Sequence, residues 1–482
     1  MHSSILSAAR LTRAVAALVT LAACATNPAT GKRELSLIPQ SQEIAMGQQG
    51  AKAAAAQMGV YPDSALQRYV NSLGQALAKS SERPDLPWSF TVVDDPNVNA
   101  FALPGGPIFF TRGILAHMNS EAQLVSVLGH EIAHVTAKHS VSQMSKQQLF
   151  QIGLIGAMVV KPELQQFGNA ASQGLGLLFL KFGRDDETQA DALGFKYMTA
   201  QNYAPSEMAE MFKTLERLSG GEGSRGTPEW LSTHPDPGNR VEKTNERIAA
   251  AGKPFTGAKV GREAFMSRID GMVYGEDPRN GYFQQTSFIH PTMKFRFDFP
   301  AGWRTQNGAE QVIGVSAQGD AQIALSLAGT EAPQQILAKF LQQQGVQAGN
   351  TSTSPINGNQ AAVGQFVAQN QDGSQLAGYV AFIQQDNTTY QLLTITPRAQ
   401  IQAYDAAFRN TIGSFQRVTD ARLLNVKPQK LRVVTLRSAM TLNQFNQQNP
   451  SVVPIATLAL INGVDPATSL PAGTQVKRIV AE

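Results

Sequence analysis

The pentapeptide His130-Glu131-Ile132-Ala133-His134 constrains this chain most, because it places two histidines and a glutamate in a helix-forming stretch. Residues four apart share one face of a helix, so His130 and His134 can present two imidazole nitrogens to one metal ion. Glu131 projects from an adjacent direction, where its carboxylate can take a proton from an attacking water. The pattern predicts a catalytic metal site with Glu131 as general base. Two buried core histidines are the alternative interpretation.

The flanking sequence predicts that this motif lies in the middle of a helix. Ser120 stands at an N-cap position and Gln123 follows three residues later, the spacing of a capping box. Apolar residues then recur with helical spacing at Leu124, Val125, Val127, Leu128, Ile132, Ala133 and Val135. We therefore expect an amphipathic helix that carries both histidines on one face.

A downstream segment offers the third ligand that a catalytic zinc ion needs, since such an ion keeps three protein ligands and one position for water. Residues 183–194, GRDDETQADALG, place Glu187 and Asp191 four apart on one face of a second helix. We expect Glu187 to reach the metal and Asp191 to accept the free N–H of a ligand histidine, which fixes its tautomer. Arg184 can pair with Glu187 or with the neighbouring acids. A solvated acidic helix start is the alternative.

These motifs carry a resemblance to a known family. HEIAH, followed by RDDETQADALG and preceded by NAFALPGG at 99–106, resembles the zinc peptidases (gluzincins) that include the CAAX prenyl proteases and the heat-shock protease HtpX. The match is closer to the periplasmic lipoprotein branch and covers about residues 25 to 285. The resemblance implies one Zn²⁺ per chain on His130, His134 and Glu187, with Asp191 beside them. It also implies an endopeptidase that acts on unfolded or misassembled envelope polypeptides.

A proline-rich segment, STHPDPGNR at 232–240, predicts a rigid loop. The lipoprotein branch has a similar THP segment with a following arginine, so the resemblance places this loop over the active site with Arg240 as a supporting residue. His234 is a candidate catalytic residue in it. Its imidazole can polarise the scissile carbonyl or cap the open zinc position. A plain turn histidine is the alternative.

Another histidine, His139, follows His134 by five residues. Metzincins use a third histidine as a ligand, but theirs lies farther along the chain and after an intervening glycine. We therefore expect His139 to be structural or to line the pocket.

The amino terminus predicts export. Arg10 and Arg13 precede an apolar segment, Ala14 to Ala23, that is too short to span a bilayer but suits a signal peptide. The sequence LAAC has the form of a bacterial lipoprotein box, and Cys24 is the one cysteine of the chain. A lone cysteine cannot form an internal disulfide, so we expect lipidation of Cys24 and a membrane anchor. The residue after it is not aspartate, which favours the outer membrane facing the periplasm; a plain secretory leader is the alternative.

Charge and length bound the remaining possibilities. The net charge of +4 includes Arg10 and Arg13, so the processed chain carries 4 − 2 = +2, and without a basic run no nucleic-acid partner is expected. The length of 482 residues predicts several domains.

We expect an α+β protein with a zincin-like, mostly helical metallopeptidase domain and a small sheet, followed by an α+β accessory domain and a small LysM-like βααβ unit. Changes in composition and periodicity set the expected boundaries. In order these are a signal peptide (1–23), a tether (24–39), the metallopeptidase domain (40–265), a linker (266–285), the accessory domain (286–418) and the LysM-like segment (428–482).

The last segment leaves the function partly open. Its LING (460–463) and LPAG (470–473) elements resemble those of a degenerate LysM unit, which implies peptidoglycan contact, and a simple packing domain is the alternative. Two other functions are consistent with the same ligands. One is an envelope chaperone or scaffold with a largely closed zinc site, and the other is a metallohydrolase that acts on peptidoglycan.

Overall fold

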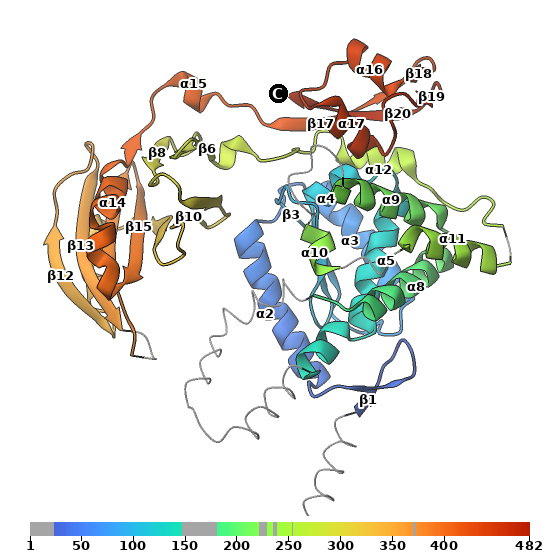
Figure 1. Cartoon of the computed structure of the whole chain (residues 1–482), viewed down its shortest axis with the longest axis horizontal. Helices are drawn as coiled ribbons and strands as arrows, with labels where there is room; N and C mark the ends of the chain where they lie inside the picture. The colour runs from blue at the N-terminus through green and yellow to red at the C-terminus, as the bar shows by residue number, and fades with distance from the viewer. Residues whose placement is uncertain (1–23, 147–180, 221–228, 235–238, 253, 370–372) are drawn as a thin grey trace, which may run out of the picture. The chain divides into compact units, whose positions relative to one another are not determined.

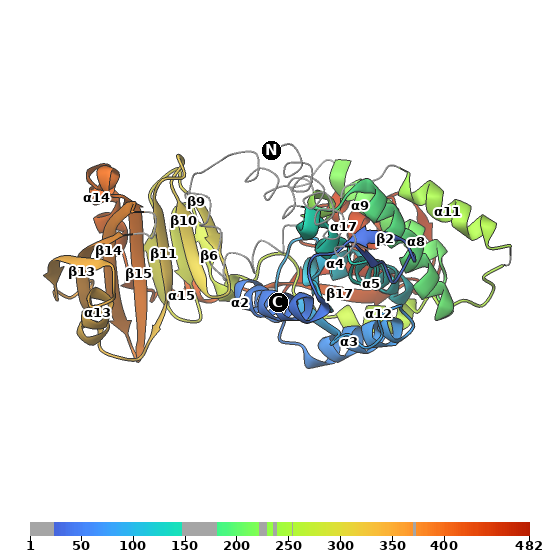
Figure 2. The same ribbon diagram turned by 90° about the horizontal axis from the view of Figure 1, so that it is seen from below.

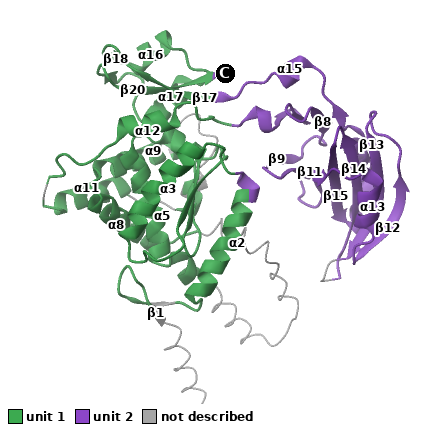
Figure 3. Ribbon diagram, turned by 180° about the vertical axis from the view of Figure 1, so that it is seen from behind, with its two compact units in different colours: residues 1–55, 60–275, 430–480 green, residues 56–59, 276–429, 481–482 purple. Residues whose placement is uncertain are grey.

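A computed structural model describes residues 24–146, 181–220, 229–234, 239–252, 254–369 and 373–482 (Figure 1). The predicted signal peptide and residues 235–238 of the proline-rich loop lie outside this part. Within it, none of the helices combines the length and the apolar character needed to cross a membrane. The chain forms two compact units, one of residues 1–55, 60–275 and 430–480 and one of residues 56–59, 276–429 and 481–482 (Figure 3). The fold class is α+β, as predicted.

The first unit is mostly helical with small sheets. Its elements before residue 275 are β1 (Cys24–Thr26), β2 (Arg33–Leu35), α2 (Gln40–Met58), α3 (Ser64–Lys79), β3 (Ser89–Val93), β4 (Ala100–Ala102), β5 (Pro107–Thr111), α4 (Arg112–His117), α5 (Glu121–Thr136), α8 (Arg184–Ala200), α9 (Ser206–Gly220), α10 (Glu229–Thr233), α11 (Arg240–Ala250) and α12 (Arg262–Ile269).

The small sheet has the order β3-β5-β4, with β3 parallel and β4 antiparallel to β5. The turn between β4 and β5 contains Gly105 and Gly106, which adopt φ of +76° and +125°. Non-glycine residues rarely adopt such angles. Within the described residues β4 is therefore an edge strand with one side available for pairing.

Helix α5 carries the metal motif and is a core helix. Every residue from Ala122 to Thr136 is buried, so the helix has no solvent face, although the spacing predicted an amphipathic one. Its cap also differs in detail from the predicted box. The Ser120 hydroxyl accepts from the Gln123 N–H at 3.2 Å, but the Gln123 side chain accepts from Asn119 and not from Ser120.

Helices α5 and α8 pack together at two glycines. A Cβ added to Gly129 would lie 3.1 Å from the Cα of Gly194, and one added to Gly194 would lie 3.0 Å from the backbone nitrogen of His130. The absence of these two side chains lets the backbones approach closely. The α8 acids are thereby brought next to the α5 histidines.

Two predicted connecting segments are folded. In the predicted tether, β1 pairs with β2, and the buried Asn27 donates to the Ala137 carbonyl at 2.9 Å. In the predicted linker, α12 continues to Ile269, which is buried together with Met266. The sequence predicted connecting segments at 24–39 and 266–285, whereas both contain residues that pack against distant parts of the first unit.

The C-terminal segment contains two adjacent helices, as predicted, but two strands stand on each side of them and the segment is not a separate unit. Its elements are β17 (Gln429–Thr435), β18 (Met440–Thr441), α16 (Leu442–Gln448), α17 (Ile455–Asn462), β19 (Ser469–Leu470) and β20 (Gln475–Ala481). Phe445, Leu458 and Ile461 belong to the same hydrophobic core as α5. The buried Lys477 ammonium donates to the Ala116 and Met118 carbonyls just before α5. The sequence pattern could not reveal this packing.

The second unit contains a seven-stranded antiparallel sheet, order β12-β13-β14-β15-β11-β10-β9, and a four-stranded sheet, order β16-β8-β7-β6. Its elements are η3 (Pro278–Asn280), β6 (Tyr282–Gln284), β7 (Ser287–His290), β8 (Phe295–Asp298), β9 (Arg304–Asn307), β10 (Gln311–Val315), β11 (Gln322–Gly329), α13 (Pro333–Leu341), β12 (Val346–Ser352), β13 (Gln360–Gln369), β14 (Gln375–Gln385), β15 (Thr388–Pro397), η4 (Arg398–Gln400), α14 (Ile401–Gly413), β16 (Gln416–Arg417) and α15 (Ala421–Leu424). Alternate residues of β14 face two cores, because Val380 and Phe382 pack with α13 whereas Tyr379 and Ala381 share a core with α14. Figure 2 shows these two helices on opposite sides of the sheet.

Candidate metal centre

Four side chains from three elements meet in the first unit. His130 and His134 come from α5, Glu187 from the first turns of α8, and His234 from the residue after α10. One donor atom of each lies within 4.8 Å of the others, and each residue is at most 1% exposed. The structure thus brings together the three predicted metal ligands and the loop histidine.

The distances within this cluster are those of converging ligands. The Nε2 atoms of His130 and His134 are 3.0 Å apart, and the Glu187 oxygens lie 3.4 and 3.5 Å from them. Both Glu187 oxygens and His234 Nε2 are buried without a hydrogen-bond partner among the described residues. A buried carboxylate in this state is costly unless a cation compensates it. The imidazole and carboxylate donors therefore fit a divalent metal ion of the first transition row or zinc.

Asp191 and Arg240 fix the His130 ring. His130 Nδ1 donates to Asp191 Oδ1 at 3.0 Å, which leaves Nε2 as the atom that faces the cluster. Arg240 donates to both oxygens of Asp191, from Nε at 2.9 Å and from Nη2. Its guanidinium carbon lies 4.1 Å from the ring centre of Phe212 and 4.8 Å from that of Trp230.

Arg184 does not take part in this network. It is exposed in the first turn of α8, and it forms no ion pair with Glu187 among the described residues. The arginine near Glu187 is Arg240, whose Nη2 lies 3.7 Å from Oε2. The prediction for Arg184 was wrong because its position in the helix turns the side chain toward solvent.

The buried charges shift the ionisation of the cluster. Burial opposes protonation of His130, but the carboxylates of Asp191 and Glu187 outweigh it and raise the pKa of this ring to about 9 for the protein chain alone. Burial and the neighbouring His130 hold the pKa of His134 well below its ordinary value. For Asp191, burial favours the neutral form, but Arg240 and His130 outweigh it and lower the pKa. In the chain without metal these shifts favour a protonated His130 and a neutral His134 at neutral pH.

Glu131 lies beside the cluster and is not one of its four members. Its side chain is fully buried, and its Oε1 lies 3.5 Å from Trp230 Nε1, which donates, and 3.6 Å from His234 Nε2. Oε2 makes no hydrogen bond among the described residues. This placement suits a general base that faces the metal ligands and keeps one oxygen for a proton.

His234 is held by the short helix before it. Its Nδ1 lies 3.0 Å from Thr233 Oγ1 and 3.2 Å from the Trp230 carbonyl. Its ring stacks on Trp230, with centroids 4.8 Å apart and an interplanar angle of 12°. Nε2 is therefore directed at the other three members of the cluster.

Sequence reasoning missed two aromatic neighbours of the site, Trp230 and Phe182, whereas it expected His139 to be structural or to line the pocket. Trp230 contacts Glu131 and His234, Phe182 stacks on His134 with centroids 3.9 Å apart, and His139 lies against His134. No spacing rule points to Trp230 or Phe182. His139 had a signal in its closeness to the motif, and the structure gives it a specific contact.

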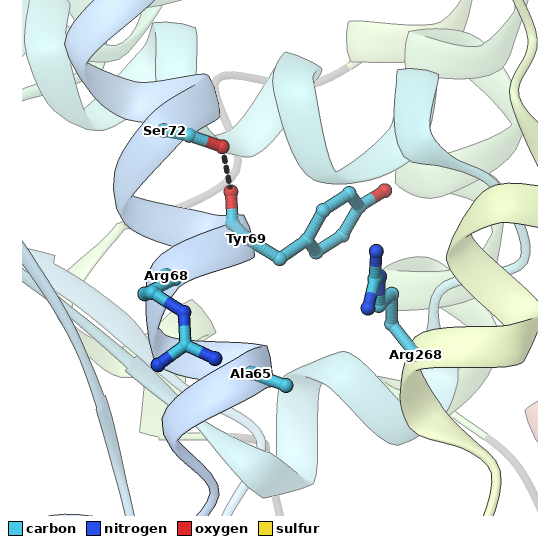
Figure 4. A pocket seen from close by; sticks show the side chains of 5 residues that line it. All are labelled: Ala65, Arg68, Tyr69, Ser72 and Arg268. Carbon is cyan, nitrogen blue, oxygen red and sulfur yellow. Dashed lines mark hydrogen bonds between the residues drawn. The ribbon is translucent and has the colours of Figure 1, made fainter.

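A separate surface hollow of about 380 Å³ lies between α3 and α12 and shares no residue with the cluster (Figure 4). Its lining residues are Ala65, Arg68, Tyr69, Ser72 and Arg268. The Arg268 guanidinium carbon lies 5.6 Å from the centre of the Tyr69 ring, and the Tyr69 hydroxyl donates to Glu121 at 2.6 Å.

Comparisons with known proteins agree with this geometry. Residues 64–248 match the model of peptidase family M48. The beta-barrel assembly-enhancing protease of Escherichia coli K12 is 29% identical over 232 residues, 46% of this chain and 47% of its own length. The Yersinia pestis protein of the same name is 30% identical over 249 residues, 49% of this chain and 50% of its length. The mitochondrial metalloendopeptidase OMA1 of Schizosaccharomyces pombe is 34% identical over 188 residues, 38% of this chain and 53% of its length.

Fold and site together define a metallopeptidase-type metal centre. The match to peptidase family M48 covers residues 64–248 and contains all four members of the cluster. The chain spans about half the length of the curated relatives that it matches.

The contact between Asp191 and His130 leads to a first prediction. Asp191→Asn removes the negative charge that orients His130 and leaves Arg240 without its ion-pair partner, so metal affinity should fall by about 10–100-fold. Competition with a chromophoric chelator measures it. Asp185→Asn, at an exposed position of the same helix, is the matched control and should bind as tightly as the wild type. Equal affinity of both variants would contradict the role of Asp191.

Proposed function

We propose that this chain is an exported zinc-dependent endopeptidase that hydrolyses peptide bonds in unfolded or misassembled envelope proteins. The observation that carries the proposal is the placement of Glu131 beside His130, His134 and Glu187 within an M48 domain. Nitrogen and carboxylate donors around one buried point suit zinc. The chaperone and peptidoglycan-hydrolase alternatives are not favoured, because the matched relatives are named as proteases.

The residues of the chain divide the chemistry between them. A bound zinc ion would polarise the scissile carbonyl and lower the pKa of the attacking water to about 7. Glu131 takes the proton of that water and passes it to the leaving amine. Trp230 holds one oxygen of Glu131 by its indole N–H, which leaves the other oxygen for the proton. Asp191 and Arg240 keep His130 oriented throughout.

The edge strand supports the substrate class. An extended peptide can add to β4 as a further strand, with backbone hydrogen bonds giving affinity. The backbone N–H of Trp230 donates to the Val98 carbonyl at 3.2 Å. Val98 lies two residues before β4, so this bond connects the strand edge to the helix that precedes His234. Such a mode requires an unfolded segment, which agrees with substrates that have failed to fold or assemble.

Glu131→Gln tests the proposed function most directly. The amide keeps the size of the side chain but cannot accept the proton, so cleavage of an unfolded polypeptide should fall by at least about 10²–10⁴-fold. Zinc content should remain at one per chain. Glu210→Gln, at an exposed position on α9, is the control and should cleave like the wild type. Cleavage that survives in Glu131→Gln would refute the proposed mechanism.

The position of His234 supports a capping role in a closed resting site, because its free Nε2 points at the ligands and every member of the cluster is buried. His234→Ala should then keep or raise peptidase activity and weaken zinc binding. If His234 instead polarises the carbonyl, activity should fall by about 10²–10³-fold. His290→Ala, in the second unit, is the control. If His234→Ala matches this control in both peptidase activity and zinc affinity, His234 is a turn histidine without either role.

Location and anchoring are part of the same proposal. The LAAC box supports lipidation of Cys24 and anchoring to the outer membrane on its periplasmic face. Asn27, three residues after Cys24, donates to the Ala137 carbonyl at the end of α5. A lipid on Cys24 would therefore hold the first unit close to the membrane. A fatty-acid probe should label the wild type and not Cys24→Ser, and an unlabelled wild type would refute the anchor.

Peptidoglycan contact by the C-terminal segment is supported by its partial likeness to a LysM unit, and simple packing against the first unit is the alternative. Binding of the full chain to purified sacculi separates the two.

A further inference from the structure

His139 reaches the cluster through a break in the helix. Five residues along a continuous α-helix correspond to a rotation of about 500°, which would place His139 about 140° away from His134. Helix α5 instead ends at Thr136, and Lys138 adopts the left-handed φ of +56°. The chain becomes helical again from His139. This turn brings the His139 ring back to the end of α5.

The contacts of His139 are short and buried. Its Nδ1 lies 2.9 Å from Nδ1 of His134, and its Nε2 lies 2.7 Å from Oε1 of Gln189 on α8. The residue is 3% exposed. Both ring nitrogens are therefore engaged with polar partners, one buried and one half-buried.

The proton positions follow from the direction of each bond. His134 Nε2 faces the cluster and must offer a lone pair to a metal, so the proton of the neutral ring is on Nδ1. That N–H can donate to His139 only if Nδ1 of His139 is unprotonated. The His139 proton is then on Nε2, and this N–H donates to the side-chain amide oxygen, Oε1, of Gln189. His139 thus accepts a hydrogen bond from His134 and donates one to Gln189.

We propose that His139 and Gln189 are positioning residues that hold His134 in the tautomer and orientation for metal binding. This inference rests on the proposed metal centre and adds two residues to it. Helix α8 then supports both ligand histidines, His130 directly through Asp191 and His134 through the pair of Gln189 and His139.

The two supports differ in their partners. Asp191 gives His130 a carboxylate that Arg240 also contacts, whereas His134 is contacted by a ring nitrogen of His139. A carboxylate oxygen of Asp186, on the same helix as Gln189, lies 3.9 Å from Nε2 of His139.

Metal affinity is the readout, because it can be measured without peptidase activity. His139→Leu removes the acceptor for His134 and should weaken zinc binding by about 10–100-fold, the usual scale for such outer contacts. His139→Gln can offer an amide oxygen to the same N–H and should recover a large part of the affinity. Gln189→Met removes the acceptor for the His139 N–H. Because Gln189 is half-buried, zinc binding should weaken by a smaller factor than in His139→Leu.

Controls separate this role from general damage. His290→Leu makes the same exchange in the second unit and should leave zinc affinity unchanged. The unfolding midpoint of each metal-stripped variant identifies any that has lost its fold, and Gln189→Met keeps the test open if His139→Leu does not fold.

Wild-type affinity in both His139→Leu and Gln189→Met would overturn the inference, as would equally weak binding by His139→Gln and His139→Leu. Either result leaves the proposed function standing if the wild type binds one zinc per chain and cleaves. A wild type that binds no zinc contradicts the proposed function itself.

Discussion

The Glu187 carboxylate lies among two buried imidazoles of α5 and a third from His234, with neither oxygen hydrogen-bonded among the described residues. Such a charge is stable in a protein interior only when a cation or strong donors compensate it. The close glycine crossing of α5 and α8 brings it there, and Arg240 and Asp191 hold the surrounding charges in place. The helix crossing and these charged contacts together keep Glu187 and the cluster histidines close to one another.

Trp230 connects the parts of the site. Its ring stacks on His234, its indole N–H donates to Glu131, and its backbone N–H donates to the Val98 carbonyl before β4. Glu131 and the four cluster residues are all buried. In the proposed endopeptidase, a substitution at Trp230 would therefore affect the general base, His234 and the strand edge together.

Local periodicity predicted the central part of the site. The four-residue spacing within HEIAH and between Glu187 and Asp191 predicted which side chains share a helix face, and the structure places them as expected. The prediction stopped where the outcome depends on turns and tertiary packing. The left-handed turn at Lys138 determines where His139 lies, and the sequence pattern does not encode the contact of Trp230 with Glu131. Composition also marked residues 24–39 and 266–285 as connectors, although buried contacts order much of both.

X-ray absorption at the zinc edge of the purified full chain, loaded with zinc and freed of excess metal, tests the central claim most directly. The account predicts one zinc per chain with about four nitrogen and oxygen neighbours at about 2.0–2.1 Å and scattering from at least two imidazole rings. Replacement of Glu187 by alanine should remove one oxygen neighbour and weaken retention of the ion. A chain that retains no zinc, or a shell of six oxygens without imidazole scattering, would contradict the account.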